Sequence, residues 1–402
     1  MSAIKKGYKQ TKVGIIPEDW EVVNFNELKD KTDSHSITGG PFGSDLKSEH
    51  YTTSGVRVIQ LQNIGDGKFI NKEFVYTSEE KANQLKNCLI YPNEIILAKM
   101  AEPVARACLI PSFEDKFLMC SDGIRLLVDK NRFSTKYILE YINYDLFRKI
   151  AIDRSTGSTR GRIGLSDLKT IPLSLPPLKE QEKIADILIT WNEAVDKQEK
   201  LIEAKELQKK ALMQKLLSGE VRFSGFTDEW EEVRLGEIAD IYQPQTISQT
   251  ELTNDGFDVY GANGIIGKYH QYNHELEQIA VTCRGNTCGT VNFTKPKSWI
   301  TGNAMVINLD NSTKAIKIFI YYLFLNTNFT YLISGSGQPQ ITGNIKNHKL
   351  KLPSLPEQQK IAEVLSLADV EINLLKNSLE ELKLQKKALM QKLLTGEVRV
   401  KV

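Results

Sequence analysis

The residues best suited to chemistry in this sequence form a basic, glycine-rich stretch, RKIAIDRSTGSTRGR, at residues 148–162. The stretch holds five Lys and Arg residues against Asp153 as its one acidic residue. Arg and Lys side chains, hydroxyl groups and exposed backbone amides all bind phosphate oxygens. We therefore take four of its residues as candidate nucleic-acid contacts: Arg154, Thr159, Arg160 and Arg162.

A second glycine-rich stretch, SGSGQPQITGNIKNHK at residues 334–349, carries amide side chains where the first carries arginines. Its candidate contacts are Gln338, Gln340 and Asn344. Arg pairs with guanine through two hydrogen bonds, and Gln or Asn pairs in the same way with adenine. The exchange is therefore what we expect of two segments that read different bases. The alternative is that both are ordinary loops leading into a strand, because base contacts also require access to a groove.

Further polar residues lie where predicted strands end. They are Gln60, Gln62 and Asn63 in VIQLQNIGDG, Asn263 and Lys268 in GANGIIGKYH, and Arg284, Asn286 and Thr287 in TCRGNTCG. We include them as candidate DNA contacts, although for any single one of them an ordinary polar loop residue is the favoured interpretation. GANGIIGKYH is not a phosphate-binding loop, because five residues separate its first two motif glycines where that motif has four.

Catalytic motifs are missing from the sequence. An adenine methyltransferase of the usual kind carries an Asn/Asp-Pro-Pro-Tyr/Phe motif, whereas the one Pro-Pro pair here, Pro176-Pro177, begins a predicted helix. The five histidines form no HExxH pair. Cys283 and Cys288 lack the second pair of ligands that structural zinc requires. We expect no catalytic residue, metal or cofactor in this chain.

Composition sets the class of protein. The 402 residues are 41% hydrophobic and 25% charged, which is typical of a folded protein with two or three domains. No apolar run approaches the roughly 20 residues that cross a bilayer, and no apolar segment follows the basic N-terminus. A cytoplasmic protein with free cysteines is therefore expected. Because the net charge is only +2, DNA binding must depend on local basic patches.

The elements that position these candidates are organised as a repeat. The segment QKKALMQKLLSGEVRF from Gln208 recurs 177 residues later, from Gln385, as QKKALMQKLLTGEVRV. At the same offset, LPPLKEQEKIADIL from Leu175 recurs as LPSLPEQQKIAEVL from Leu352. The chain therefore consists of two variable blocks, each followed by a copy of one repeated segment.

Each repeated segment is predicted to be one long helix with an apolar seam. Pro near its start and Gly at its end favour helix termini there. The seam has a 3.5-residue period, which is typical of a coiled coil. Lys209 and Lys386 also fall on it, so the coiled coil either loosens there or offers these lysines to a partner. The apolar seam residues, which we assign to helix pairing and partner docking, are Ile184, Leu188, Trp191, Leu212, Leu216, Ile361, Leu365, Leu375, Leu382, Leu389 and Leu393.

The predicted fold class is α+β, with two mixed α/β domains joined by two long helices that pack as an antiparallel coiled coil. Independent helical hairpins are the alternative to this pairing. The blocks contain alternating or continuous apolar runs, such as GVRVIQLQNI and NAMVINL, which favour strands. The boundaries we expect are residues 1–175 for the first domain, 176–219 for the first helix, 220–352 for the second domain and 353–397 for the second helix.

This architecture resembles the specificity subunits of type I restriction-modification systems. The doubled helix motif carries the resemblance, together with GPFGSDLK in the first block and YGANGIIGKY, TCRGNTCGTV and WITGNAM in the second. The resemblance implies that each block is a target-recognition domain that reads one half of a split, asymmetric DNA site. It implies that the helices set the half-site spacing and dock two adenine methyltransferase subunits, which use S-adenosylmethionine. ATP-dependent motor-nuclease subunits that need Mg²⁺ complete the implied complex.

Three other functions are compatible with parts of the sequence. A DNA-binding piece of a fused restriction enzyme, a coiled-coil adaptor without a DNA role, and an enzyme of unknown mechanism each leave the doubled architecture unexplained. A charge at Leu389 and Leu393 is expected to weaken partner docking while leaving both domains folded.

Overall fold

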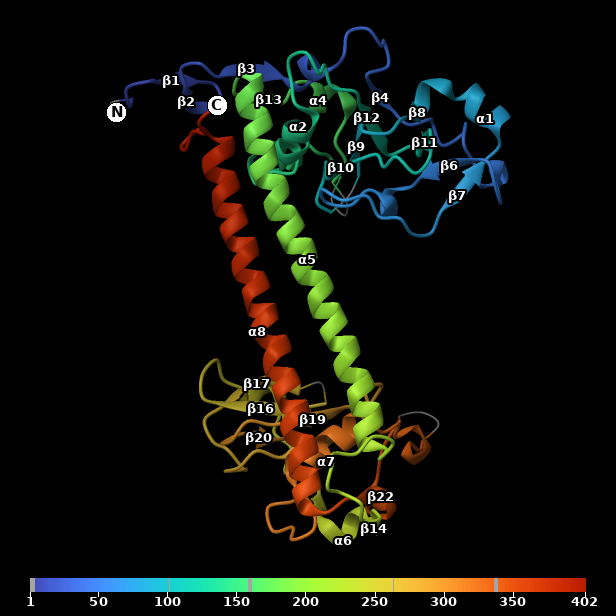
Figure 1. Ribbon diagram of the computed structural model, residues 1–402, viewed down its shortest axis with the longest axis vertical. Coiled ribbons are helices and arrows are strands. Elements are labelled where there is room, and N and C mark those ends of the chain that lie inside the picture. The colour runs from blue at the N-terminus through green and yellow to red at the C-terminus, as the bar shows by residue number, and fades with distance from the viewer. Residues whose placement is uncertain (1–3, 101, 158–160, 263, 336–338) are drawn as a thin grey trace. The chain divides into compact units, whose positions relative to one another are not determined.

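The computed structural model describes residues 4–100, 102–157, 161–262, 264–335 and 339–402 (Figure 1). The chain divides into two compact units. The first unit comprises Met1–Lys197 and Leu379–Val402, and the second comprises Gln198–Ser378. Because the boundary falls inside two long helices, each unit contains a part of both helices.

The first unit is built on two sheets. A four-stranded antiparallel sheet has the order β10-β9-β12-β4, and a five-stranded sheet has the order β5-β7-β6-β11-β8 with β6 and β11 parallel. Strand β9, which has the sequence IILA, is buried along its whole length, as its continuous apolar run predicts. The strands are β4 (Ile37–Gly39), β5 (Tyr51–Thr52), β6 (Val56–Ile59), β7 (Val75–Thr77), β8 (Leu89–Ile90), β9 (Ile95–Ala98), β10 (Ala107–Leu109), β11 (Phe117–Met119) and β12 (Gly123–Leu126).

The second unit repeats this framework. Its four-stranded sheet has the order β19-β18-β21-β15, and its three-stranded sheet has the order β17-β16-β20 with β16 and β20 parallel. The strands are β15 (Asp240–Tyr242), β16 (Phe257–Gly261), β17 (Gly264–Tyr269), β18 (Ile279–Thr282), β19 (Val291–Phe293), β20 (Trp299–Ile300) and β21 (Ala304–Asn308). The strand register matches β4, β9, β10 and β12 with β15, β18, β19 and β21, respectively.

Short elements complete both units. Three two-stranded sheets pair β1 with β2, β3 with β13, and β14 with β22. These strands are β1 (Tyr8–Thr11), β2 (Gly14–Pro17), β3 (Glu21–Asn24), β13 (Pro172–Leu175), β14 (Glu231–Arg234) and β22 (Lys349–Leu352). The short helices are α1 (Glu79–Gln84), α2 (Thr135–Ile142), α3 (Asp145–Asp153), α4 (Leu165–Lys169), α6 (Leu235–Ile238) and α7 (Lys317–Leu325).

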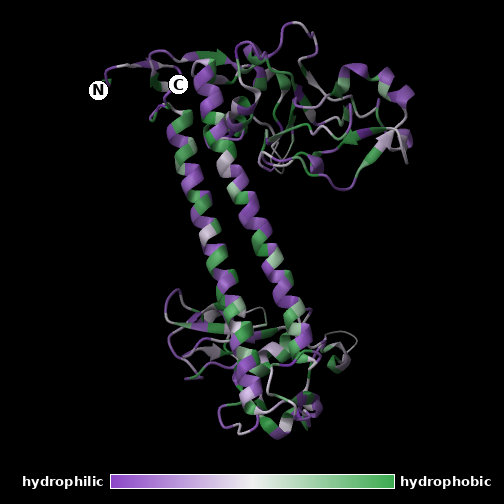
Figure 2. Cartoon of the chain, viewed as in Figure 1, coloured by the Kyte–Doolittle hydropathy of each residue, from purple (hydrophilic) through white to green (hydrophobic). Residues whose placement is uncertain are grey.

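The two long helices that the repeat predicts are α5 (Leu178–Leu217) and α8 (Leu355–Leu394), each of 40 residues. Both end before a glycine with positive φ, Gly219 at 75° and Gly396 at 73°, a conformation that suits a helix C-terminus. Figure 2 shows hydrophilic and hydrophobic residues alternating along both helices. Within the described residues, no helix is both long and apolar enough to cross a membrane.

Within each unit, α5 and α8 pack antiparallel. In the second unit, the Gln198 amide donates to the Leu375 carbonyl at 3.0 Å, and Lys205 forms an ion pair with Glu371 at 2.6 Å. In the first unit, Ile184 of α5 shares a hydrophobic core with Leu393 of α8. In both units, residue numbers rise along one helix as they fall along its partner. The predicted fold class is confirmed.

The seam residues near the helix ends belong to the domain cores. Ile184, Leu188 and Leu393 are buried in the core of the first unit, and Leu216, Ile361 and Leu365 are buried in that of the second. The remaining predicted seam residues are partly buried: Trp191, Leu212, Leu375, Leu382 and Leu389. The expectation that charges at Leu389 and Leu393 leave both domains folded is therefore wrong, because Leu393 is only 2% exposed within the first core.

The seam lysines contact carboxylates or lie near them. Lys209 forms an ion pair with Asp369 on the facing helix. Lys386 lies near Glu140, and its positive charge favours the ionised carboxylate. Burial raises the pKa of Glu140, while Lys386 and a hydrogen bond from Asn192 oppose that shift. Both lysines therefore compensate acidic groups within their own units.

Candidate nucleic-acid interface

In the first unit, several loops meet at one end of the four-stranded sheet. They follow β4 (residues 40–47), follow β9 (99–106, without 101), precede β12 (120–122) and precede α4 (154–164, without 158–160). Two hydrogen bonds fix the loop after β9: Lys99 N donates to the Asp122 carbonyl at 2.7 Å, and Ile163 N donates to the Lys99 carbonyl at 3.0 Å. The basic stretch at residues 148–162 therefore ends beside the loop between β9 and β10, although the two are distant in the sequence.

The second unit contains the same arrangement. Cys283 N donates to the Asn303 carbonyl at 3.0 Å, and Ile341 N donates to the Cys283 carbonyl at 3.0 Å. Cys283 thus occupies the position that Lys99 has in the first unit. The β-bridge between Thr156 and Arg162 likewise corresponds to the bridge between Ser334 and Gln340.

Arg162 and Gln340 therefore occupy equivalent backbone positions. Both side chains are exposed. Arg162 forms an ion pair with Asp122 at 2.9 Å, which orients its guanidinium group. The sequence indicated that an arginine in the first block is exchanged for an amide in the second. Arg162 and Gln340 show this exchange at equivalent positions of the two units.

The two candidate loops of the second unit form one surface. Arg284 forms a β-bridge with Gln340, and Gly285 N donates to the Pro339 carbonyl at 3.0 Å. The side chains of Arg284 and Asn286 are exposed, and Thr287 is partly buried. Arg284 and Gln340, which are 56 positions apart in the sequence, therefore lie on adjacent loops.

Other candidates are used within the fold. Asn63 is fully buried, and its amide donates to the carbonyls of Ile70 and Lys72 at 3.2 and 2.7 Å. Its side chain is therefore unavailable to a base in this conformation. Arg154 donates to the Asp167 carbonyl and to Thr170 Oγ1, at 3.2 and 2.6 Å.

The remaining described candidates are more accessible. Gln62 is exposed and hydrogen-bonds to Gln60, which is partly buried. Lys268 forms an ion pair with Asp258 at 2.8 Å, and this contact lowers the pKa of the aspartate. Asn344 is exposed in a short 3₁₀ helix. The other candidates lie outside the described residues: Thr159, Arg160, Asn263 and Gln338.

A hollow of about 520 Å³ opens beside the loop that follows β4, and sequence reasoning missed two of its residues. Lys99 and Phe42 line it together with Arg162. Phe42 is 82% exposed at the tip of the Gly-Pro-Phe-Gly turn. A Cβ at Gly40 would lie 1.7 Å from the Cys120 carbonyl oxygen, so only glycine allows this close approach. The GPFG motif was a signal for the loop, but Lys99 lies in an apolar run that indicated only a strand.

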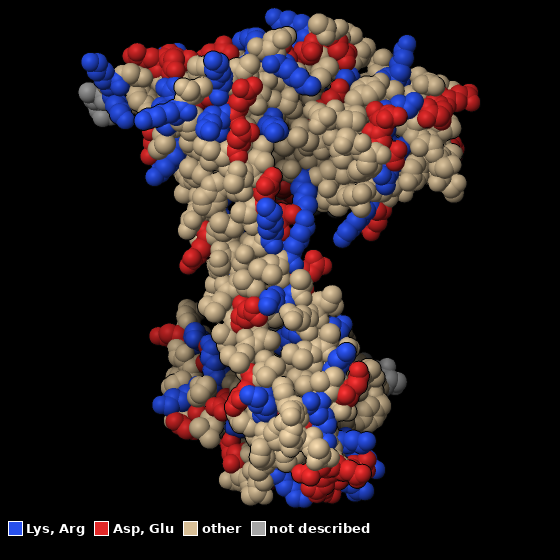
Figure 3. All heavy atoms as spheres, viewed as in Figure 1, with Lys and Arg blue, Asp and Glu red and all other residues tan. Residues whose placement is uncertain are grey.

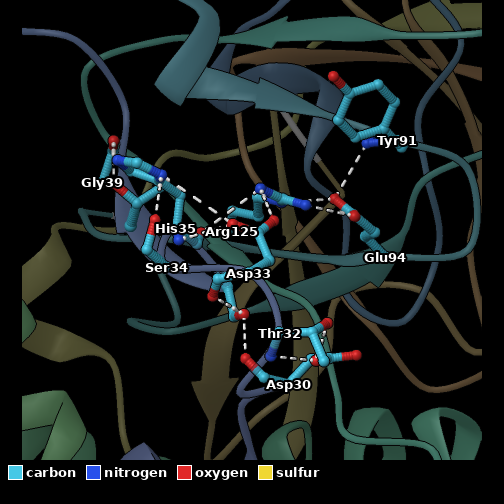
Figure 4. Close-up of polar contacts among 11 residues, drawn as sticks. Asp30, Thr32, Asp33, Ser34, His35, Gly39, Tyr91, Glu94 and Arg125 are labelled. Carbon is cyan, nitrogen blue, oxygen red and sulfur yellow. Dashed lines mark hydrogen bonds and ion pairs between the residues drawn. The ribbon is translucent and has the colours of Figure 1, made fainter.

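A buried charged cluster supports the sheet of the first unit (Figure 4). Arg125 of β12 donates to both carboxylate oxygens of Glu94 at 2.7 Å and forms an ion pair with Asp33 at 3.0 Å. Arg125 and Glu94 are only 5% and 6% exposed. The cluster connects β12 to the segments that precede β4 and β9, at the opposite end of these strands from the loop that carries Phe42.

Charge is mixed across the visible surface. Figure 3 shows Lys and Arg side chains interspersed with Asp and Glu side chains on the face in view. Among the residues that the structure describes, no three His, Cys, Asp or Glu side chains are grouped closely enough to hold a metal ion. The described loop residues offer hydrogen-bond donors and charged groups to a polar ligand.

Comparison with known proteins identifies the family. The family model described as the type I restriction modification DNA specificity domain matches residues 17–207 and, a second time, residues 227–384. The chain belongs to this family. As a specificity subunit, it takes part in recognition of a DNA sequence, and its loop surfaces are the candidate sites for that role.

Relatives of this specificity subunit span nearly its whole length. A Methanocaldococcus jannaschii protein assigned as the type I restriction enzyme MjaX specificity subunit is 26% identical over 99% of this chain and 98% of the relative. The MjaIX specificity subunit of the same organism is 21% identical over 98% of this chain and 96% of the relative.

Solved structures share the fold. The S subunit of the type I restriction-modification system from M. genitalium matches with a TM-score of 0.59 and 20% identity, over 93% of this chain and 96% of that one. A chain from a structural study of complex assembly and conformational transition in the type I R-M system matches with a TM-score of 0.60 and 17% identity, over 95% of this chain and 99% of that one.

Proposed function

We propose that the two units of this specificity subunit read the two halves of a split, asymmetric DNA site. The observation that carries the proposal is the equivalence of Arg162 and Gln340 on two copies of one framework. Arginine favours guanine and glutamine favours adenine in the major groove. Two similar surfaces with different donors suit two different half-sites. The long helices set the spacing between these halves.

The repeated helix segment docks two copies of one methyltransferase subunit. The eleven residues LQKKALMQKLL occur at 207–217 and again at 384–394. Leu207 is 68% exposed and Leu384 is 67% exposed. In each copy an exposed alanine and an exposed glutamine follow at four and seven residues, which places all three on one helix face. Two identical exposed faces suit two copies of the same partner, whereas the buried seam residues stabilise the helix pair and the domain cores.

The reaction chemistry belongs to partner subunits. The methyltransferase subunits bind S-adenosylmethionine and methylate adenine, and motor-nuclease subunits use ATP and Mg²⁺ for restriction. The missing methyltransferase motif supports this division of roles. The chain itself binds no cofactor and supplies the choice of DNA sequence.

A base-resolution methylome of the host, with and without this gene, tests the proposal. We expect a two-part motif with N6-methyladenine in both halves to be present with the gene and to disappear on its deletion. An unchanged methylome in a host that expresses the methyltransferase subunits would contradict a specificity role directed at methylation. Salt-independent or absent DNA binding by the assembled complex would then favour a coiled-coil adaptor.

A further inference from the structure

Lys99 has an unusual environment for a lysine on a DNA-binding protein. Both of its backbone polar groups are hydrogen-bonded, to Asp122 and to Ile163, so the position of its Cα atom is well fixed. Its side chain lines the hollow next to Arg162. The ammonium group makes no hydrogen bond or ion pair with any described residue.

The charge of this lysine is poorly compensated. Burial and the charge of Arg162 both lower the pKa of Lys99, and Asp122 only partly opposes them. Asp122 is itself paired with Arg162. Asp45 is the acidic residue in the described lining of the hollow, and its carboxylate is exposed. The ammonium group is therefore available to an acceptor that water or a ligand supplies.

Glycine residues keep the hollow open. A Cβ atom at Gly39 would lie 3.5 Å from the Lys99 Nζ atom, so a longer side chain there would compete with the ammonium group for space. The neighbouring Gly40 allows the turn to approach the Cys120 carbonyl. The volume of about 520 Å³ accommodates a phosphate group and several waters, each of which takes about 30 Å³.

In the second unit, side chains fill the position that is equivalent to the hollow. The strand registers match Lys99 with Cys283 and Gly39 with Gln243. Cys283 is fully buried, and its sulfur accepts a hydrogen bond from the Gln243 amide at 2.9 Å. The glutamine side chain therefore contacts the thiol at a position where the first unit has space and a positive charge.

We propose that Lys99, in the hollow kept open by Gly39 and Gly40, binds a phosphate group of the DNA backbone. The second unit lacks this anchor, because Cys283 occupies the matched position. A lysine ammonium is a compact point charge that suits a phosphate, whereas Arg162 on the rim has the fork geometry that suits a base edge. The inference rests on the proposal that these loops face DNA.

The salt dependence of DNA binding tests this anchor. The probes are a duplex that carries the motif found in the methylome and a duplex of random sequence, each titrated with the complex of the full chain and its methyltransferase subunits. The Lys99→Gln variant is expected to bind both duplexes roughly tenfold more weakly, and its plot of log K against log salt is expected to lose about 0.9 of slope. Lys99→Arg should retain the slope.

The matched control is Lys130→Gln, which removes the same charge from an exposed lysine beyond the other end of β12. It should change neither affinity nor slope. A Lys99→Gln complex with an unchanged slope would overturn the phosphate anchor, as would a loss of affinity confined to the motif duplex. If the wild-type complex does not prefer the motif duplex, the DNA-reading proposal fails and the anchor fails with it.

Discussion

The two recognition units share a strand order but stabilise it differently. The first unit places the charged pair Arg125 and Glu94 in its four-stranded sheet, where the matched residues of the second unit are Val306 and Gln278. Near the loops, the first unit has Lys99 in an open hollow, where the second has a buried Cys283. Backbone geometry is therefore retained while side-chain chemistry changes, both at the charged pair and near the loops.

The largest expected difference between the units concerns the buried charged pair. Arg125→Met leaves Glu94 as an uncompensated buried carboxylate, so the first unit should lose about 3–5 kcal/mol of its free energy of unfolding. Hydrogen exchange followed by mass spectrometry can measure this loss unit by unit. The second unit should keep its protection.

Two variants sharpen this prediction. The double variant Arg125→Met with Glu94→Gln should recover most of the loss, because no charge then remains buried without a partner. Arg132→Met is a matched control, since its ion pair with Glu21 is exposed and is expected to contribute about 0–1 kcal/mol. Equal destabilisation by Arg125→Met and Arg132→Met would show that burial of the pair has no special effect.

The next largest effect concerns the two copies of the docking face. Leu207→Glu or Leu384→Glu should weaken the binding of one methyltransferase subunit by about 30-fold or more, because each places a charge at the centre of an apolar contact. Native mass spectrometry should find two subunits bound to the wild-type chain, one to each single variant and none to the double variant. Leu201→Glu, on the same helix but outside the eleven identical residues 207–217, should still bind two. Retention of both subunits by the double variant would place the docking face elsewhere.

The smallest effect is a pH dependence in the second unit. Burial lowers the pKa of His274, whose ring is held between Tyr242 and Asn273 at 2.9 and 2.6 Å. The folded histidine therefore takes up its proton at a lower pH than the unfolded chain does, so stability should decrease as the pH falls through about 6.5. His274→Gln should reduce this decrease, as measured by hydrogen exchange of the second unit at pH 7.5 and 5.5, and the pKa of His348, which burial also lowers, accounts for the remainder. An identical pH profile in the variant would exclude His274 as its source.

Much of the fold follows from local rules in the sequence. The Pro and Gly residues that bracket the repeat predict two long helices, and the 3.5-residue period predicts that they pair. A heptad pattern does not show what covers each seam position, however. Leu393 is an example: it packs into a domain core, although its spacing equally suits a contact with the facing helix or with a partner.

The candidate site was predictable from sequence where the two halves of the chain resemble each other, because matched residues then occupy matched positions in the fold. The weak correspondence of the two glycine-rich stretches anticipates the equivalence of Arg162 and Gln340. The role of Lys99 depends on strand pairing between residues more than 60 apart, and its apolar sequence neighbours conceal it. Asn63 shows the opposite case, because a polar residue at a strand end proves to be a buried support of its own loop.

The most direct test of reading by halves is a methylome of hosts that express Arg162→Gln or Gln340→Arg in place of the wild-type chain. Each substitution exchanges the donor type at one of two equivalent positions. We predict that Arg162→Gln changes or relaxes bases in one half of the motif and that Gln340→Arg changes bases in the other half. Changes by both variants in the same half, or a motif left intact by both, would contradict the assignment of one half-site to each unit.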